Sequence, residues 1–168
     1  FEGTVHSILV PKNGSTTIVV PFDLGDSESI ESAAKIVVEK ETNIDGLYHF
    51  GGISQRSYAN ETSIDVDRKI FEVNFFGTIE LTKKVLPAMI KSGGGQIGVT
   101  TSIVGKFGFP YRSSYAATKH ALHGFFESLR AENVSNKVLV SMIIPGRIKT
   151  NISVNALDKD GNTHNKMD

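Results

Sequence analysis

The sequence contains no cysteine and no tryptophan, and neither sign of charge is in excess. Without cysteine there can be no disulfide framework, zinc–thiolate site, iron–sulfur cluster or cysteine nucleophile. The 18 basic residues equal the 18 acidic residues, which argues against a nucleic-acid-binding protein that depends on a strong basic field. No apolar run approaches the roughly 20 residues that span a bilayer. The first residues also lack the basic start and apolar core of a secretory signal.

The chain has 168 residues, which suits one domain with a sizeable core. Its five histidines are scattered, with no pair at ligand spacing next to a carboxylate, so no metal site is predicted. Together with the lack of cysteine, these features predict a soluble domain in a reducing compartment, and we expect it to be cytoplasmic. Because the chain begins at Phe1 rather than Met, membrane association through residues outside this sequence stays open as an alternative.

Short apolar runs alternate along the chain with longer segments whose apolar residues recur at helical spacing. Strands are predicted at 17–21, 47–50, 96–102 and 137–144. Helices are predicted from residue 28, from 64 to 90 and from 114 to 132, with caps at Asp26-Ser27, at Thr62 or Ser63, and at Ser113 or Ser114. This order predicts an α/β fold with a parallel sheet covered by helices on both faces, followed by a polar, mobile tail over 155–168. In such sheets ligands bind beyond the carboxyl ends of the strands.

Tyr115 and Lys119 form the strongest local signal, in the stretch Ser114-Tyr115-Ala116-Ala117-Thr118-Lys119. Residues four apart on a helix share a face, so the two side chains project into the same space. A nearby ammonium stabilises phenolate and lowers the tyrosine pKa from its usual value of about 10. The pair can therefore serve general acid–base catalysis. Taken alone, such a pair is more often an ordinary packed or solvated helix face.

The surrounding residues favour the chemical interpretation. Ser102 ends a predicted strand 13 residues before Tyr115, with two glycines in the intervening loop. At this point the sequence resembles the short-chain dehydrogenase/reductases, whose motif is a strand-end Ser followed 13 residues later by Tyr-x-x-x-Lys. Asn74, in Val73-Asn74-Phe75-Phe76-Gly77, is similar to the family's helix Asn. The stretch 105–132 is most similar to the subgroup of dehydrogenase/reductase member 7 and its bacterial relatives.

Two further positions extend this resemblance over roughly residues 17 to 157. Pro145-Gly146, followed by Thr150, matches the family's Pro-Gly turn after its sixth strand, and Asp23-Leu24 matches the acidic position that contacts the cofactor's adenine. The resemblance implies a Rossmann-like doubly wound parallel sheet that lacks its first strands and its last strand, in a single partial dinucleotide-binding domain over 1–168. It also implies an oxidoreductase that interconverts a carbonyl and an alcohol by hydride transfer with NAD or NADP, because no side chain can deliver a hydride.

The resemblance also implies a role for each matching residue. Tyr115 would exchange a proton with the substrate oxygen, Lys119 would lower the Tyr115 pKa and bind the nicotinamide ribose, and Ser102 would orient the substrate oxygen. Asn74 would hold a water that links Lys119 to bulk solvent. A structural bond to a neighbouring strand is the alternative for Asn74, since a polar side chain on an apolar helix face needs a partner. The implied cofactor-contacting residues are Asp23, Leu24, Gly51, Gly52, Asn74, Tyr115, Lys119, Pro145, Gly146 and Thr150.

The sequence departs from the family pattern in two places. Its opening lacks the family's Thr-Gly-x-x-x-Gly-x-Gly string, which brings the pyrophosphate onto a helix N-terminus. Lys12-Asn13-Gly14-Ser15 is the only glycine-bearing turn before Asp23, and it predicts a hairpin or loop. In the family, the residue that selects between NAD and NADP follows the second strand. This sequence lacks that strand, so both cofactors stay open. His49-Phe50-Gly51-Gly52 stands where the family has Asn-Asn-Ala-Gly. His49 is predicted to be either a core histidine bonded to backbone or an exposed one.

Two hypotheses about function follow. The first is an active carbonyl/alcohol oxidoreductase, and the second is a diverged or truncated scaffold of the same family that binds no dinucleotide and acts as an interaction protein. Phe107, Phe109 and Tyr111 indicate an apolar wall for a small-molecule substrate such as a steroid, retinoid or lipid-like carbonyl. The resemblance further implies a homodimer or homotetramer formed through the helices at 64–90 and 114–132. No nucleic-acid partner is expected.

Overall fold

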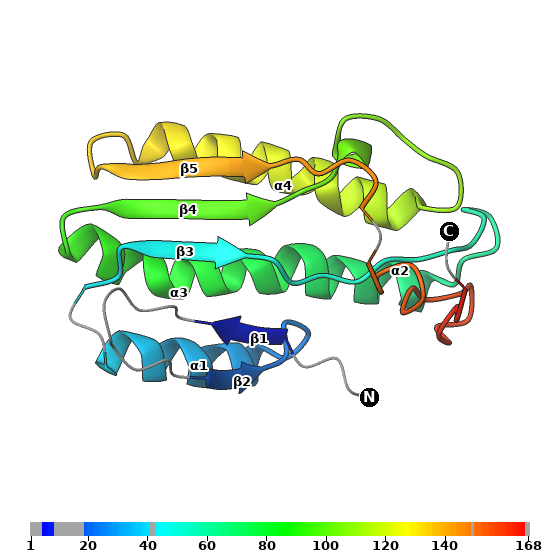
Figure 1. The fold of residues 1–168 in the computed structure, drawn as a ribbon, viewed down its shortest axis with the longest axis horizontal. Coiled ribbons are helices and arrows are strands. Elements are labelled where there is room, and N and C mark those ends of the chain that lie inside the picture. The colour runs from blue at the N-terminus through cyan, green and yellow to red at the C-terminus, as the bar shows by residue number, and fades with distance from the viewer. Residues whose placement is uncertain (1–4, 9–18, 41–42, 149, 167–168) are drawn as a thin grey trace.

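A computed structural model of the chain describes residues 5–8, 19–40, 43–148 and 150–166 (Figure 1). Strands β1 (Val5–Ile8) and β2 (Val19–Phe22) come first, followed by helix α1 (Ser27–Lys40) and strand β3 (Gly46–His49). The long central helical segment consists of α2 (Ile64–Phe71), a π-helical turn (Glu72–Phe76) and α3 (Gly77–Lys91). Strand β4 (Gly95–Thr100), a 3-10 turn (Ile103–Gly105), helix α4 (Ser113–Glu132) and strand β5 (Val138–Ile143) complete the order.

Strands β3, β4 and β5 form a parallel sheet in that order, with Leu47 opposite Ile97 and Ile97 opposite Val140. This confirms the predicted α/β fold with a parallel sheet. The run predicted at 17–21 is strand β2, which pairs antiparallel with β1 in a separate two-stranded sheet. Strand β1 was not predicted, because four residues without periodic apolar character give no sequence signal. The turn predicted at 12–15 and residues 17 and 18 lie outside the described residues.

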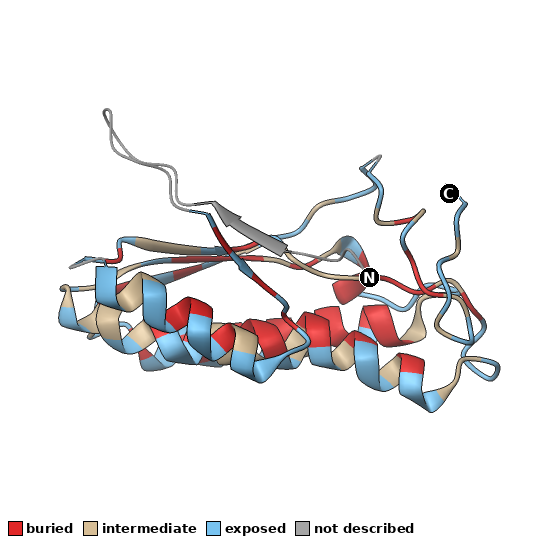
Figure 2. Cartoon of the chain, turned by 90° about the horizontal axis from the view of Figure 1, so that it is seen from below, coloured by how far each residue is buried: buried red, intermediate tan, exposed pale blue. Residues whose placement is uncertain are grey.

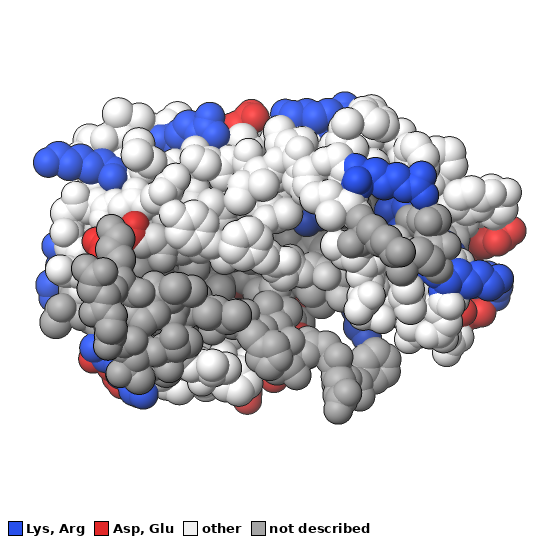
Figure 3. Space-filling view, in the orientation of Figure 1, with Lys and Arg blue, Asp and Glu red and all other residues white. Residues whose placement is uncertain are grey.

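The helices lie on one face of the parallel sheet (Figures 1 and 2). Their buried side faces the strands, and the core between the layers contains Val85, Met89, Ile97, Val99, Leu122, Phe126, Val138 and Val140. On the opposite face, Tyr48 is 50%, Leu139 68% and Ile143 40% exposed. The sequence predicted helices on both faces of the parallel sheet, whereas the helices among the described residues cover only one face. Figure 3 shows the open face, where uncharged atoms lie over β4 and β5 and charged side chains lie around the rim.

Two of the three predicted helix caps are confirmed. Asp26 Oδ1 accepts from the backbone N–H of Glu28 at 3.0 Å, and Ser63 Oγ accepts from that of Val66 at 3.3 Å. Such bonds satisfy backbone donors that the first turn of a helix leaves unpaired. The predicted cap of α4 is wrong: Ser113 and Ser114 lie inside the first turn, and the capping position belongs to Arg112, which makes no side-chain cap bond.

The helix predicted from 64 to 90 is interrupted by the π-helical turn that carries Asn74. Within this turn the backbone N–H of Gly77 bonds to the carbonyl of Glu72. Gly77 then begins α3 and packs closely on the backbone of Leu24. The contact is so close that a Cβ at residue 77 would overlap the Leu24 carbonyl oxygen. Such one-turn π segments are frequent at functional sites, and this one places Asn74, 1% exposed, inside the molecule.

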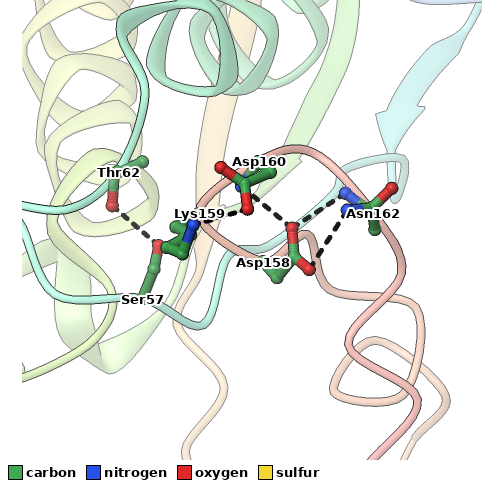
Figure 4. A network of polar contacts seen from close by, with 6 residues as sticks. All are labelled: Ser57, Thr62, Asp158, Lys159, Asp160 and Asn162. Carbon is green, nitrogen blue, oxygen red and sulfur yellow. Dashed lines mark hydrogen bonds and ion pairs between the residues drawn. The ribbon is translucent and has the colours of Figure 1, made fainter.

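The polar tail over 155–168 was predicted to be mobile, and the structure instead docks its described part, residues 155–166. The Leu157 N–H bonds to the Ser54 carbonyl and the Arg56 N–H bonds to the Leu157 carbonyl, both at 2.8 Å. The Leu157 side chain is buried against α2. The Asp158 carboxylate then closes a turn by accepting from the N–H groups of Asp160 and Asn162, both at 2.9 Å (Figure 4). No helix in the described ranges combines the length and the apolar character needed to cross a membrane.

Candidate active site

Ser102, Tyr115 and Lys119 come together beyond the carboxyl end of β4. Ser102 follows β4 by two residues, and its Oγ accepts from the Val104 N–H at 3.4 Å, which starts the 3-10 turn. Tyr115 and Lys119 lie on the first two turns of α4 and are only 8% and 4% exposed. The ammonium nitrogen of Lys119 is 5.5 Å from the centre of the Tyr115 ring. The predicted shared helix face is therefore confirmed.

Lys119 is a buried lysine with a backbone partner. Its Nζ donates to the Thr100 carbonyl at 3.0 Å, at the end of β4. Burial disfavours the charged ammonium and lowers the pKa of Lys119 from 10.5 to about 8. Beside it, Thr100 Oγ1 is buried and has no hydrogen-bond partner among the described residues.

The pKa of the Tyr115 phenol is raised, chiefly because burial disfavours the phenolate. A hydrogen bond from Ser102 and the positive charges of Arg112 and Arg56 act in the opposite direction. The effect of Lys119 on the Tyr115 pKa stays a prediction, because burial outweighs the groups that lower this pKa in the structure.

Asn74 connects the central helical segment to the chain that follows β3. Its Oδ1 accepts from the Ile53 N–H at 2.8 Å, and its Nδ2 donates to the Ile53 carbonyl at 2.9 Å. The Nδ2 group is also 3.3 Å from Thr118 Oγ1 on α4. Of the two roles considered for Asn74, the structural hydrogen bond is therefore present.

Gly52 lies between Asn74 and Lys119. A Cβ at residue 52 would stand 3.1 Å from Asn74 Oδ1 and 3.8 Å from Lys119 Nζ, so glycine allows the backbone to approach both groups closely. Gly51 and Gly52 are half-buried and are separated from the end of β3 by Phe50. Gly52, Asn74 and Lys119 lie together with Ser102 and Tyr115. We call these five residues the catalytic cluster.

His49 is buried and bonds to a side chain rather than to backbone, which corrects the predicted partner. Its Nε2 is 2.9 Å from Thr82 Oγ1. The Thr82 hydroxyl donates its own hydrogen to the Thr78 carbonyl, so Nε2 must carry the imidazole hydrogen. Burial lowers the pKa of His49 from 6.5 to about 4, which keeps the ring neutral at pH 7. Phe50, the next residue, is 71% exposed and stacks on Tyr48.

The remaining predicted cofactor residues fall into two groups. Pro145 lies next to the catalytic cluster, because its carbonyl accepts from the Ile103 N–H at 3.1 Å, and Gly146 and Thr150 follow it on the surface. Asp23 and Leu24 belong instead to the turn between β2 and α1. The Asp23 side chain is exposed and its Oδ1 accepts from the Gly25 N–H at 2.8 Å. The Leu24 side chain is 3% exposed, so only its backbone could face a ligand.

Three residues near the cluster were missed by the sequence analysis. Gln55 is fully buried and contacts the first turn of α4 through the Tyr115 N–H. Arg56 follows it and bonds to the hydroxyls of Ser54 and Ser153 at 2.8 and 3.0 Å. His123 lies one turn beyond Lys119, with its Nδ1 3.3 Å from Lys106 Nζ. No periodicity or motif marks these positions, because each acquires its partners only through the tertiary fold.

The chain belongs to the short-chain dehydrogenase family. The family model described as short chain dehydrogenase matches residues 5–161. Dehydrogenase/reductase SDR family member 7B of Rattus norvegicus is 44% identical over 150 residues, which are 89% of this chain and 46% of that protein. Dehydrogenase/reductase SDR family protein 7-like of Drosophila melanogaster is 42% identical over 150 residues, with the same coverage of 89% and 46%. The chain thus spans about half the length of the curated relatives that it matches.

Solved structures of the family share this fold. A short-chain dehydrogenase from Streptomyces avermitilis superposes with a TM-score of 0.75 at 31% identity, covering 82% of this chain and 51% of that one. A short chain dehydrogenase from Burkholderia cenocepacia, solved in complex with NADP, has a TM-score of 0.73 at 29% identity and covers 81% of this chain and 56% of that one. The Rossmann-like α/β fold predicted from the sequence is therefore confirmed.

The catalytic cluster fits the nicotinamide-ribose end of a dinucleotide. It offers the buried ammonium of Lys119, the phenol of Tyr115 and a glycine, Gly52, whose missing Cβ leaves space beside both Asn74 and Lys119. The Thr100 hydroxyl adds a buried polar atom without a partner among the described residues. For the adenine end, the exposed Asp23 carboxylate would be the corresponding acceptor. No glycine-rich turn at a helix N-terminus occurs within the described ranges to hold a pyrophosphate.

Proposed function

We propose that this chain is a nicotinamide-dependent oxidoreductase that interconverts a carbonyl and an alcohol, with Tyr115 as its general acid–base. One observation carries the proposal: the Lys119 ammonium lies 5.5 Å from the centre of the buried Tyr115 ring, and Ser102 is close enough to lower the Tyr115 pKa. Membership of the short-chain dehydrogenase family supports it. An ordinary packed helix face would not require a buried ammonium at this place, since burying a lysine is costly.

In this mechanism Tyr115 transfers a proton to or from the substrate oxygen, and Ser102 holds that oxygen by a hydrogen bond. Because the pKa of Tyr115 is raised from 10, the phenol is protonated at neutral pH and would donate its proton to the substrate oxygen in carbonyl reduction. Lys119, whose ammonium lies 5.5 Å from the centre of the Tyr115 ring, would bind the nicotinamide ribose. Asn74 joins α4 to the segment after β3 through its bonds to Thr118 and Ile53.

The cofactor in this proposal is NAD or NADP, which supplies the hydride when bound. Gly51, Gly52, Tyr115 and Lys119 would hold its nicotinamide end together with Pro145, Gly146 and Thr150, and Asp23 and the Leu24 backbone would contact its adenine. The Burkholderia cenocepacia structure contains NADP, which supports a dinucleotide site without selecting one form for this chain.

The substrate is proposed to be a small carbonyl or alcohol with an apolar body. Phe107, Phe109 and Tyr111 lie in the loop between Ser102 and Tyr115 and are 47%, 51% and 46% exposed, so their rings are available to an apolar ligand. Tyr111 packs on Tyr58 with ring centres 4.5 Å apart. An open cavity of about 510 Å³ lies beside these two tyrosines, and the rest of its lining is polar or charged, including Arg56, Glu61 and Asp158.

We also propose that the protein forms homodimers or homotetramers through the helices at 64–90 and 114–132. An open groove of about 380 Å³ lies on the outer side of these helices, and Phe75 and Phe125 line it. Phe76 beside it is 48% exposed. Apolar rings at an exposed helical surface are typical of subunit interfaces. A cytoplasmic location and a single domain over 1–168 complete the proposal.

The decisive experiment replaces Tyr115 by phenylalanine and measures NADPH and NADH oxidation with a panel of apolar aldehydes and ketones. Tyr115→Phe is expected to lower turnover by about 100-fold or more, the usual contribution of a general acid. Tyr48→Phe is the matched control, since the Tyr48 hydroxyl lies on the open sheet face and donates to Gln96 at 2.9 Å. Near-normal turnover in Tyr115→Phe would rule out the assignment.

The alternative proposal is an interaction protein that binds no dinucleotide. The exposed apolar side chains of the open sheet face favour it, because monomeric proteins rarely expose large apolar patches. Calorimetry with NADPH and NADH on the 168-residue chain separates the two proposals. Heat of binding that disappears in Lys119→Met supports the oxidoreductase. Absence of heat with either dinucleotide supports the interaction protein.

A further inference from the structure

Helix α4 begins without a cap from its own sequence. Its capping residue, Arg112, makes no side-chain cap bond, and the Ser113 hydroxyl accepts a hydrogen bond from Gln55. Ser114 donates to the Asp67 carboxylate on α2. The third N–H of the helix, which a capping side chain would normally bind, is the N–H of Tyr115.

Gln55 supplies the missing cap from 60 residues away in the sequence. Its Oε1 accepts from the Tyr115 N–H at 3.0 Å, and its Nε2 donates to Ser113 Oγ at 3.0 Å. Both ends of the amide are therefore bonded to the first turn of α4. The side chain is 0% exposed, so water cannot replace either bond at low cost.

The position of Gln55 is itself fixed on both sides. The flanking peptide groups pair with the docked tail, through the Leu157 N–H to the Ser54 carbonyl and the Arg56 N–H to the Leu157 carbonyl, both at 2.8 Å. Two residues earlier, Ile53 is held by the Asn74 amide at 2.8 and 2.9 Å. Gln55 therefore connects a fixed segment of backbone to the first turn of α4.

The bonds around Tyr115 form a closed ring. The Tyr115 N–H is bound by Gln55, and the Tyr115 carbonyl accepts from Thr118 Oγ1 at 2.8 Å. Thr118 Oγ1 is in turn 3.3 Å from Asn74 Nδ2, and Asn74 bonds to Ile53, two residues before Gln55. Both peptide groups that flank the Tyr115 side chain are thus fixed by buried polar side chains.

We propose that Gln55 is a positioning residue that sets the place of the Tyr115 phenol by capping α4 from outside the helix. The inference rests on the proposed function of Tyr115. A phenol that must reach both the substrate oxygen and Ser102 tolerates little displacement, and a shift of about 1 Å can cost on the order of 100-fold in rate. The Gln55 amide bonds to the backbone of Tyr115 and to the hydroxyl of Ser113, so it acts on the phenol through the helix.

The test uses the whole 168-residue chain and three variants. Gln55→Leu removes both bonds. Gln55→Glu keeps an acceptor for the Tyr115 N–H and lets the Ser113 hydroxyl donate to the carboxylate. Asn133→Leu is the matched control, because Asn133 is also a buried amide bonded to α4 backbone, at the opposite end of the helix, by Nδ2 to the Leu129 carbonyl at 2.9 Å.

Three measurements are made: hydrogen exchange of the Tyr115 and Leu122 amides, kcat and KM for carbonyl reduction, and the ¹³Cζ resonance of Tyr115. In Gln55→Leu we expect the Tyr115 amide to exchange about tenfold faster or more while Leu122 changes far less, and kcat to fall by about tenfold or more at unchanged KM. Asn133→Leu should change none of these selectively. Gln55→Glu should restore exchange and kcat and move the basic limb of the pH–rate profile upward, since an added negative charge raises the Tyr115 pKa.

Wild-type exchange at the Tyr115 amide in Gln55→Leu would overturn the inference, and so would wild-type kcat once that amide has lost its protection. If the unchanged chain shows no turnover, the proposed function fails by itself, and the ¹³Cζ resonance decides about Gln55: a shift in Gln55→Leu that Asn133→Leu lacks supports positioning, and no shift overturns it. If Gln55→Leu does not fold, Gln55→Glu carries the test, with an unmoved pH profile or ¹³Cζ resonance overturning the inference.

Discussion

Asn74 and Ile53 exchange two hydrogen bonds, as if the asparagine amide were a peptide group of a neighbouring strand. Oδ1 accepts from the Ile53 N–H at 2.8 Å and Nδ2 donates to the Ile53 carbonyl at 2.9 Å. The chain after β3 thereby satisfies its backbone without a strand partner at this residue. Because Asn74 is 1% exposed, neither bond can be replaced by water.

Asn74→Asp tests this relationship through its pH dependence. The carboxylate keeps the acceptor for the Ile53 N–H but faces the Ile53 carbonyl with a second acceptor, so we expect a loss of about 2–3 kcal/mol in the free energy of unfolding at pH 7. Burial raises the pKa of the new carboxyl, and its protonated form regains a donor. The difference from the unchanged protein, measured by urea unfolding at each pH, should therefore shrink as pH falls. A difference that is constant from pH 7 to pH 4 would contradict this account.

The sequence predicted which side chains come together better than it predicted the surroundings that hold them. Ser102, Tyr115 and Lys119 could be found because helical spacing and a strand end are local features. The π-helical turn around Asn74 could not be found, since it arises where α3 meets Leu24 and no periodicity marks it. The cap of α4 was assigned to Ser113 or Ser114 by local rules, whereas the tertiary fold gave that role to Gln55.

The electrostatics of the cluster were also beyond the sequence. Spacing alone predicted that Lys119 lowers the Tyr115 pKa, whereas burial raises it. The depth at which the two side chains lie decides the sign, and depth depends on how α4 packs against the end of β4. The same holds for His49, whose neutral state follows from its burial beside Thr82.

The lowered pKa of the buried His49 predicts that the protein loses stability in acid. Its pKa is about 4 in the folded protein and 6.5 otherwise, so the unfolded chain binds more protons between these values. The free energy of unfolding should therefore fall as pH drops from about 6.5 to about 4, by at most about 3 kcal/mol. His49→Asn, which keeps a donor for Thr82, should flatten this interval in urea unfolding. His120→Asn, exposed on α4, is the control and should keep the full pH dependence. An unchanged slope in His49→Asn would assign the acid sensitivity to other groups.

Gly77 and Gly124 offer a matched pair of glycine-to-alanine changes in helices. A Cβ at residue 77 would overlap the Leu24 carbonyl oxygen, whereas nothing lies within 4 Å of one at residue 124. Gly77→Ala should destabilise the protein by about 2–4 kcal/mol because α3 must move away from Leu24. Gly124→Ala should stabilise it by about 0.5–1 kcal/mol, since alanine favours the helix. Thermal or urea unfolding measures both, and equal effects would mean that the contact between α3 and Leu24 is absent.

The lowered pKa of the buried Lys119 predicts that the protein gains stability in alkali. Its pKa is about 8 in the folded protein and 10.5 otherwise, so the unfolded chain binds more protons between these values. The free energy of unfolding should rise from about pH 8 to pH 10.5, because the cost of the buried ammonium disappears as it loses its proton. Lys119→Met removes that cost at every pH and should stabilise the protein at pH 7 by about 1–3 kcal/mol, less what the lost bond to the Thr100 carbonyl contributed. Lys91→Met, at an exposed lysine, is the control.

A less stable Lys119→Met at pH 7 would show that the bond to Thr100 outweighs the cost of burial. A more stable one that no longer binds dinucleotide would show that this residue is kept for binding at the expense of the fold.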